Sequence, residues 1–180
     1  CAPTGGSAGV IPGTVLGTAE ALNLSEEDKV KAMLATAAIG ICMGKDHKFS
    51  AELYGCQVEP GAASAMAAGG LTYYLNGSID QALNAASIAL QNILGIICDP
   101  VAGLVQVPCI SRNVSASANA VTAANIAAGG FDGAIPFDEV EETMFRVGSQ
   151  LPSELRCTCN GGLCLTSTAK ELRDEFEATL

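Results

Sequence analysis

The sequence predicts an all-α fold in a single domain over residues 1–180, with Gly- and Pro-rich loops that gather at one site. The first observation is composition: the chain has 29 Ala, 20 Gly, five Phe, three Tyr and no Trp, which favours helices whose small side chains pack closely. The second is the helix-capping signals, which recur ahead of apolar stretches. The third is length, because 180 residues suit one domain that buries roughly 70% of its unfolded surface.

The first two helices are predicted from a proline and a cap. Pro12 suits the first turn of a helix over 11–22, where its missing N–H has no intrahelical partner to lose. The run Ser25-Glu26-Glu27-Asp28 has the pattern of a capping box and opens a second helix that extends to about residue 42. A polar loop over 44–55 follows.

The next two helices are separated by a turn at Asn76-Gly77. The first of them begins at Pro60 and ends near residue 75. The run Ser78-Ile79-Asp80-Gln81 is a second capping box and opens a helix that stops at Gly95. Residues 96–110 are apolar, but Pro and Gly interrupt them too often for one helix, so we expect a buried, shaped loop there.

Three helices are expected in the last third of the chain. An Ala-rich helix over 113–128 is closed by Gly129-Gly130, since glycine ends helices readily. The run Asp138-Glu139-Val140-Glu141 caps a helix that reaches about residue 150. Residues 151–167 form a loop, and the run Thr168-Ala169-Lys170-Glu171 caps a charged last helix.

Charge and hydropathy exclude several classes of protein. The net charge of −10 leaves no basic surface for nucleic acid. Hydrophobic residues make up 49% and charged residues 16%, which is the reverse of a disordered chain. No apolar run is long enough for a membrane span. The sequence begins with Cys1 and has no signal-peptide pattern, so we expect a processed piece of a longer cytoplasmic protein.

The chain has eight cysteines and no CxxC pair, which excludes zinc-ribbon spacing. Cys56, Cys98 and Cys109 each lie beside turn residues. Thiolates are the usual ligands of iron–sulfur clusters, and adjacent Gly or Pro lets the backbone bend around the inorganic core. An isolated cysteine is more often a small buried hydrophobe. Spacing alone leaves both interpretations open.

The segment over residues 2–9 is rich in glycine and precedes the first expected helix. Its N–H groups can converge on an anion at the positive end of the helix dipole, and a carboxylate fits there. The alternative is an ordinary Gly-rich segment with a Thr or Ser cap. The segment lacks the GxGxxG and GxxxxGK spacings, so it does not predict nucleotide binding.

Four segments together resemble one family, and the resemblance covers essentially all 180 residues. They are Ala-Pro-Thr-Gly-Gly-Ser-Ala-Gly at 2–9, Gly-Cys-Gln-Val-Glu at 55–59, Cys-Asp-Pro-Val-Ala-Gly-Leu-Val-Gln-Val-Pro-Cys-Ile-Ser-Arg-Asn at 98–113, and Gly-Gly-Leu-Cys-Leu-Thr-Ser-Thr at 161–168. They are similar to the α-chain catalytic domain of the iron–sulfur-dependent bacterial L-serine dehydratases. The segment at 98–113 is the most specific.

The resemblance implies a cofactor and a reaction. It implies a [4Fe–4S] cluster held by Cys56, Cys98 and Cys109, with one iron open to substrate and no pyridoxal phosphate. It implies that L-serine loses water and yields pyruvate and ammonia, the open iron acting as a Lewis acid. It also implies that the substrate carboxylate is held by four residues at the start of the first helix: Thr4, Gly5, Gly6 and Ser7.

The catalytic base is not identified by the sequence. His47 is the only histidine, and its charged neighbours predict an exposed loop. Ser50 keeps the place of a serine that precedes Gly-Cys-Gln in relatives, so these two residues are the candidates. In the family a β domain or β subunit supplies a histidine-containing segment that this chain lacks. The resemblance therefore implies half of an enzyme, active as a homo- or hetero-oligomer with that β part.

Several residues leave alternatives open. Cys157, Cys159 and Cys164 lie in one loop, and either one of them is a fourth cluster ligand or all three are free thiols. Asp99 and Arg112 flank the ligand cysteines, where structural pairing of loop ends is expected. One acidic residue, Glu59, precedes Pro60 at a helix start, where the dipole alone favours a carboxylate, so no catalytic role is assigned to it.

The substrate and the class of protein also stay open. L-Cysteine or L-threonine would react by the same elimination, because only the leaving group changes or a methyl group is added. A protein of a different class, a non-catalytic helical partner that binds a cluster, is the remaining alternative.

Overall fold

The computed structural model describes residues 3–44 and 49–179, and its elements confirm the all-α prediction. These residues form eight helices: α1 (Ser7–Ala21), α2 (Glu26–Met43), α3 (Ala51–Tyr54), α4 (Pro60–Tyr74), α5 (Ile79–Gln91), α6 (Cys109–Ala128), α7 (Phe137–Gln150) and α8 (Ser167–Glu177). Four single 3₁₀ turns lie between them: η1 (Cys56–Val58), η2 (Val101–Gly103), η3 (Ser153–Leu155) and η4 (Gly162–Leu165). Within the described residues the extended backbone forms one isolated bridge, between Cys98 and Arg156, and no named strand.

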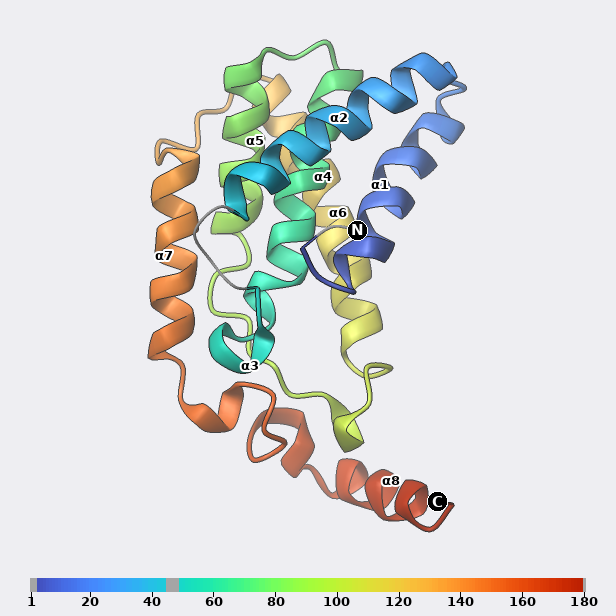
Figure 1. Cartoon of the computed structure of the whole chain (residues 1–180), viewed down its shortest axis with the longest axis vertical. Coiled ribbons are helices and arrows are strands. Elements are labelled where there is room, and N and C mark those ends of the chain that lie inside the picture. Colours follow the sequence, from blue (N-terminus) through green and yellow to red (C-terminus); the bar gives the residue numbers. More distant parts are fainter. Residues whose placement is uncertain (1–2, 45–48, 180) are drawn as a thin grey trace.

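Helix α4 is the centre of the fold. It packs against α1, α2, α5 and α6, which surround it in Figure 1. Every residue from 60 to 72 is buried, as expected for a helix that is apolar on all sides. Its Ala, Gly and Ser side chains keep the neighbouring helices close, so the core reaches high density with few large side chains.

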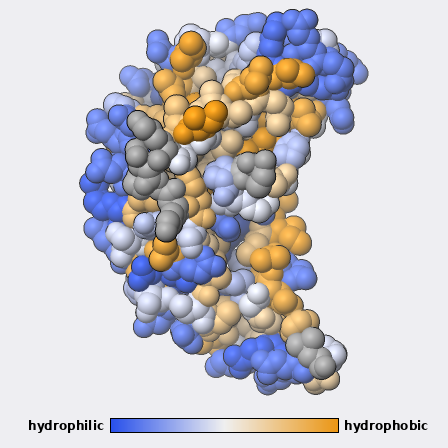
Figure 2. All heavy atoms as spheres, viewed as in Figure 1, coloured by the Kyte–Doolittle hydropathy of each residue, from blue (hydrophilic) through white to orange (hydrophobic). Residues whose placement is uncertain are grey.

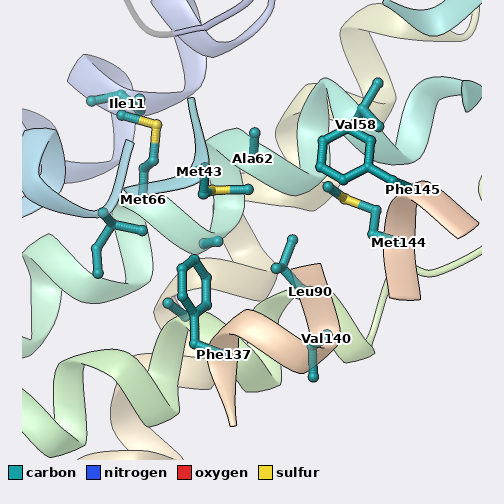
Figure 3. Packing of buried hydrophobic residues seen from close by; sticks show 13 residues of the cluster. Ile11, Met43, Val58, Ala62, Met66, Leu90, Phe137, Val140, Met144 and Phe145 are labelled. Atoms are coloured by element: carbon teal, nitrogen blue, oxygen red, sulfur yellow. The ribbon is translucent and has the colours of Figure 1, made fainter. Parts of the chain in front are cut away.

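Larger side chains fill the core where α4 faces α2, α5 and α7. Met43, Met66, Leu90, Met144 and Phe145 meet there, as Figure 3 shows. A second cluster, between α4, α5 and α6, consists mostly of alanine. The C-terminal helix α8 packs on η2 and η4 and not on this core, so Figure 1 shows it as a projecting lower segment.

Helices α2 and α4 approach so closely at Gly70 that adding one methyl group there should lower the stability of the fold. A Cβ added to Gly70 would overlap the hydroxyl of Thr36 and lie 3.0 Å from the carbonyl oxygen of Ala32. We expect Gly70→Ala to lower the free energy of unfolding by about 1–3 kcal/mol, measured by urea denaturation. Gly17→Ala is the matched control, because a Cβ at this exposed helical position meets nothing within 4 Å, and we expect it to be neutral or stabilising by up to about 1 kcal/mol. A Gly70→Ala chain as stable as the wild type would contradict the close packing of α2 on α4.

Local capping signals are confirmed at two helices. The Ser25 side chain accepts from the N–H of Asp28, whose carboxylate accepts in return from Ser25. Ser78 and Gln81 form the same reciprocal pair at α5. Both capping boxes can be predicted from the sequence because all the groups involved lie within three residues of one another.

Other helix ends differ from the prediction. Helix α1 begins at Ser7 and not at residue 11, because the Thr4 hydroxyl accepts the N–H of Ser7 and starts the helix one turn earlier. Pro12 therefore lies inside α1. Helix α6 begins at Cys109 and not at 113, where the carbonyl of Pro108 accepts from the N–H of Arg112.

Three further boundaries move as well. Helix α5 ends at Gln91, four residues before Gly95, and a short helix, α3, interrupts the loop expected over 44–55. Helix α7 begins at Phe137 without a side-chain cap, and α8 is capped by Thr166 and not by Thr168. Within the described residues, none of the helices combines the length and the apolar character that a membrane span requires.

Candidate functional site

A pocket of about 370 Å³ lies where the beginnings of α1, α4 and α6 meet. Figure 1 shows these three helix starts facing the region above the C-terminal segment. The pocket is lined by two cysteines, three charged or polar side chains, two glycines and three apolar residues: Cys56, Cys109, Glu59, Arg112, Asn113, Gly5, Gly6, Pro60, Val105 and Ile110. A wider groove between α1 and α2 has no titratable side chain among its described lining residues, whereas the smaller pocket contains two of the three cysteines that the sequence singles out.

The segment before α4 positions Cys56. Gly55 has a φ of 76°, a left-handed conformation that glycine adopts without strain, and this bend brings the next residues against the loop after α5. The N–H of Gln57 donates to the carbonyl of Ile96 over 3.1 Å. The fully buried Gln57 amide oxygen accepts from Gly95 over 2.8 Å. Sequence reasoning missed this anchoring role of Gln57.

Cys98 is held between two segments that are distant in sequence. Its N–H donates to the carbonyl of Leu155, and its own carbonyl accepts from Cys157, both over 2.8 Å. Cys98 and Cys56 are buried in one small cluster, with Cys157 packed against it. The structure therefore brings Cys157, one of the three loop cysteines, directly to Cys98.

The contact between Cys56 and Cys98 shifts the pKa values of the two thiols in opposite directions. The Cys98 thiol donates toward Cys56, and this contact lowers the pKa of Cys56, assisted by the nearby charge of Arg112 and opposed by burial. The same contact, together with burial and the charge on Cys56, raises the pKa of Cys98. Deprotonated sulfur is the form that binds metals, and the lowered pKa of Cys56 favours that form.

Cys109, the third cysteine of the predicted set, lines the same pocket as Cys56. It is the first residue of α6 and is partly buried, and burial followed by the charge on Cys56 raises its pKa. Among the described residues, no three His, Cys, Asp or Glu side chains converge tightly enough to hold a single metal ion. An iron–sulfur cluster is larger than one ion and takes thiolates around its inorganic core. Cys56 and Cys109 line the pocket, and Cys98 is buried against Cys56, so the three thiols have the chemistry that such a cluster requires.

Cys159 and Cys164 have a different environment from Cys157. Both thiols donate to the carbonyl of Pro100, over 3.6 and 3.1 Å, and neither lines the pocket. Burial and the contact with Cys159 raise the pKa of Cys164 to about 11. These two cysteines fasten their loop to the segment that carries Cys98.

A buried ion pair supports the same segment. Asp99 is 2% exposed, and its Oδ1 lies 2.8 Å from the Arg112 guanidinium. Its Oδ2 accepts from the N–H of Leu163 over 2.8 Å. Arg112 also donates to the carbonyl of Ile97 over 2.9 Å. The pair joins the loop of Cys98, the first turn of α6 and η4, which agrees with the structural pairing expected for these residues.

The four residues predicted to hold a carboxylate divide into two kinds. Gly5 and Gly6 line the pocket, and neither N–H donates to a described residue. Thr4 and Ser7 are buried, and their hydroxyls lie 2.8 Å from each other. Ser7 also donates to the carbonyl of Glu59 over 3.3 Å, so these two hydroxyls join the start of α1 to that of α4. Contact of all four residues with substrate stays a prediction.

Of the two candidates for a catalytic role, the structure describes only Ser50. The Ser50 hydroxyl donates to the carboxylate of Glu52 over 2.5 Å and does not line the pocket. His47 lies outside the described residues. The pocket instead contains Glu59, which the sequence suggested was only a residue at a helix start. Burial and the charge of Glu52 raise the pKa of Glu59.

Comparison with known proteins identifies similar chains. A family model described as "Serine dehydratase alpha chain" matches residues 1–164. The "Probable L-serine dehydratase, alpha chain" of Bacillus subtilis (strain 168) is 43% identical over 174 residues, which is 97% of this chain and 58% of that protein. The "L-serine dehydratase, alpha chain" of Peptoniphilus asaccharolyticus is 42% identical over 97% of this chain and 60% of its own.

A longer relative has a different name. The "L-serine dehydratase" of Streptomyces coelicolor (strain ATCC BAA-471 / A3(2) / M145) is 42% identical over 91% of this chain, which is 36% of that protein. The chain thus spans about three fifths of the two alpha chains and about a third of this longer relative.

Proposed function

Because the chain belongs to the serine dehydratase alpha chain family, we propose that it is the cluster-binding part of an enzyme that converts L-serine to pyruvate and ammonia. In this reaction the α-proton and the β-hydroxyl leave as water, and the enamine formed becomes an imine that water hydrolyses. The observation that carries the proposal is the thiol arrangement: Cys56 against Cys98, with Cys109 lining the same pocket as Cys56.

We propose that Cys56, Cys98 and Cys109 hold a [4Fe–4S] cluster. When bound, the cluster would supply a Lewis-acidic iron that makes hydroxide a better leaving group. The chain's own residues prepare the ligands. Arg112 lies beside Cys56 and favours its thiolate, and Asp99 keeps that guanidinium in place.

The carboxylate of the substrate is assigned to the start of α1. Gly5 and Gly6 line the pocket, and neither N–H donates to a described residue. Unpaired N–H groups at a helix start favour an anion. The paired hydroxyls of Thr4 and Ser7 hold this turn against α4. The free pocket volume of about 370 Å³ accommodates a small amino acid beside the thiols.

A β part is proposed to complete the active site. Two relatives are named as alpha chains, and the longer relative contains the matched region as about a third of its length. Apolar side chains near the pocket offer a surface that the β part could bury. Val105, Ile110 and Val114 are 60–70% exposed, and Figure 2 shows apolar side chains along the concave edge beside α6. We expect the missing base to come from that part. A reducing cytoplasm suits the described cysteines, all of which are free.

Anaerobic reconstitution with iron and sulfide tests this function. The chain is mixed with its β part, iron per chain is counted, and pyruvate release from L-serine is measured. We expect about four irons per chain, pyruvate release by the mixture, and little or none by either part alone.

Each other outcome selects a different function. Iron uptake with turnover of L-cysteine or L-threonine in preference to L-serine would change the substrate. Iron uptake with no turnover of these amino acids would favour a non-catalytic cluster-binding partner. A mixture that takes up no iron would leave the three cysteines as buried hydrophobes.

A further inference from the structure

The pocket contains one acidic side chain that no described residue neutralises. Glu59 is partly buried and lines the pocket with Cys56 and Cys109. Its backbone is fixed on both sides: the Glu59 N–H donates to Cys56, and the Glu59 carbonyl accepts from Ala63. Its carboxylate makes no hydrogen bond or ion pair with a described residue and does not cap α4. The side chain is thus available to whatever enters the pocket.

The only cationic side chain among the described residues that line the pocket is already committed. Arg112 pairs with Asp99 over 2.8 Å and donates to the carbonyl of Ile97, and it also lies against Cys56. Its charge is therefore balanced by Asp99. A partly buried carboxylate without a counter-ion loses hydration and gains nothing in return, so a cationic ligand group at Glu59 would be stabilised.

The rest of the pocket is complementary to the other end of a small amino acid. The N–H groups of Gly5 and Gly6 suit a carboxylate, and the Asn113 side chain lies against Gly6 and adds a neutral amide. Pro60, Val105 and Ile110 form apolar walls that leave no partner for a long polar side chain.

On the basis of the function proposed above, we propose that Glu59 binds the α-ammonium group of the substrate. The pocket then recognises a small zwitterion through two opposite features: the carboxylate of Glu59 and the N–H groups of Gly5 and Gly6. An α-amino acid satisfies both, whereas the corresponding 2-hydroxy acid satisfies only the second. Glu59 is thereby the residue that selects amino acids over hydroxy acids.

Calorimetric titration of the cluster-loaded complex with two unreactive ligands tests this role. L-Alanine and L-lactate lack the β-hydroxyl that would leave, and they differ from each other only in the α-ammonium and α-hydroxyl groups. We expect the wild type to bind L-alanine more tightly than L-lactate. Glu59→Gln should weaken L-alanine about 10- to 100-fold, as for a lost hydrogen bond to a charged group, and leave L-lactate unchanged.

Two controls make the result specific. Iron content should be the same in Glu59→Gln and in the wild type, which shows that the thiol site is intact. Glu171→Gln removes an equal charge from an exposed position on α8 and should leave both affinities unchanged.

The outcomes separate this proposal from the proposed function. Equal loss of both ligands in Glu59→Gln, an unchanged affinity for L-alanine, or a wild type that binds neither ligand would each overturn the role of Glu59. Selective loss of L-alanine binding by Glu59→Gln, in a wild-type complex that releases no pyruvate from L-serine, would support the role of Glu59 and reject the dehydratase function. Pyruvate release with an unchanged KM for L-serine in Glu59→Gln would support the dehydratase function and reject the role of Glu59.

Discussion

Cys98→Ser is expected to reduce reconstituted iron from about four per chain to less than about a tenth of that amount. Cys98 is the central member of the proposed set, because its thiol contacts both Cys56 and Cys157 and its backbone is held from two sides. Serine has nearly the same shape, so the fold should persist, but its hydroxyl is a poor ligand for iron–sulfur iron. Anaerobic iron and sulfide analysis, with circular dichroism to verify the helices, measures the effect.

Two other cysteines serve as comparisons. Cys42→Ser changes an exposed thiol on α2 and should leave iron uptake intact. Cys157→Ser tests the fourth-ligand alternative: full iron uptake makes Cys157 a structural neighbour of Cys98, and a loss as large as that of Cys98→Ser makes it a ligand. The cluster proposal fails if serine at positions 56, 98 and 109, changed one at a time, leaves iron content untouched.

Asp99→Ala is expected to lower the free energy of unfolding by about 2–4 kcal/mol. The substitution leaves the Arg112 guanidinium without its partner at 2.8 Å and the N–H of Leu163 without an acceptor. Asp99 is 2% exposed, so water cannot replace either contact. Urea denaturation of the isolated chain measures the loss, and iron uptake should also fall because Asp99 is next to Cys98 in the chain.

Two further variants show whether the loss of stability in Asp99→Ala comes from the buried ion pair. Asp99→Asn keeps an oxygen for Leu163 but removes the charge, so its loss should be smaller than that of Asp99→Ala. Asp174→Ala removes an exposed carboxylate whose distance to Arg173 is 3.8 Å and should change stability by less than about 0.5 kcal/mol. An Asp99→Ala chain within that margin of the wild type would show that the buried pair is not a support of the site.

Local signals explain why much of the fold is predictable. The capping boxes at Ser25 and Ser78 need groups within three residues of each other, and the abundance of alanine and glycine predicts helices in close contact. Helix starts that depend on the path of the preceding chain are harder to place. The Thr4 hydroxyl begins α1 before Pro12, and α6 begins at Cys109, because backbone groups outside the periodic pattern supply the first contacts.

The candidate site is partly predictable from its motifs. The segments around Cys56, Cys98 and Cys109 identify these three residues as one set by resemblance. The structure brings Cys56 against Cys98 and places Cys109 in the lining of the same pocket as Cys56. The position of Cys157 beside Cys98 could not be derived from spacing. It depends on backbone hydrogen bonds between segments 59 residues apart in the printed sequence, and no local pattern encodes such a pairing.

The sequence by itself determined the helical class and the capped starts of α2 and α5, because each of these depends on composition or on neighbouring residues. Its motifs also singled out, by resemblance, the three cysteines proposed as cluster ligands. Only the tertiary structure decided what surrounds the thiols. It commits Arg112 to Asp99 and, among the residues that the structure describes, leaves the carboxylate of Glu59 unpaired in the pocket. In sequence Glu59 looks like an acid at a helix start. Its role depends on which charges three separate helices bring to one pocket, and that is a property of packing.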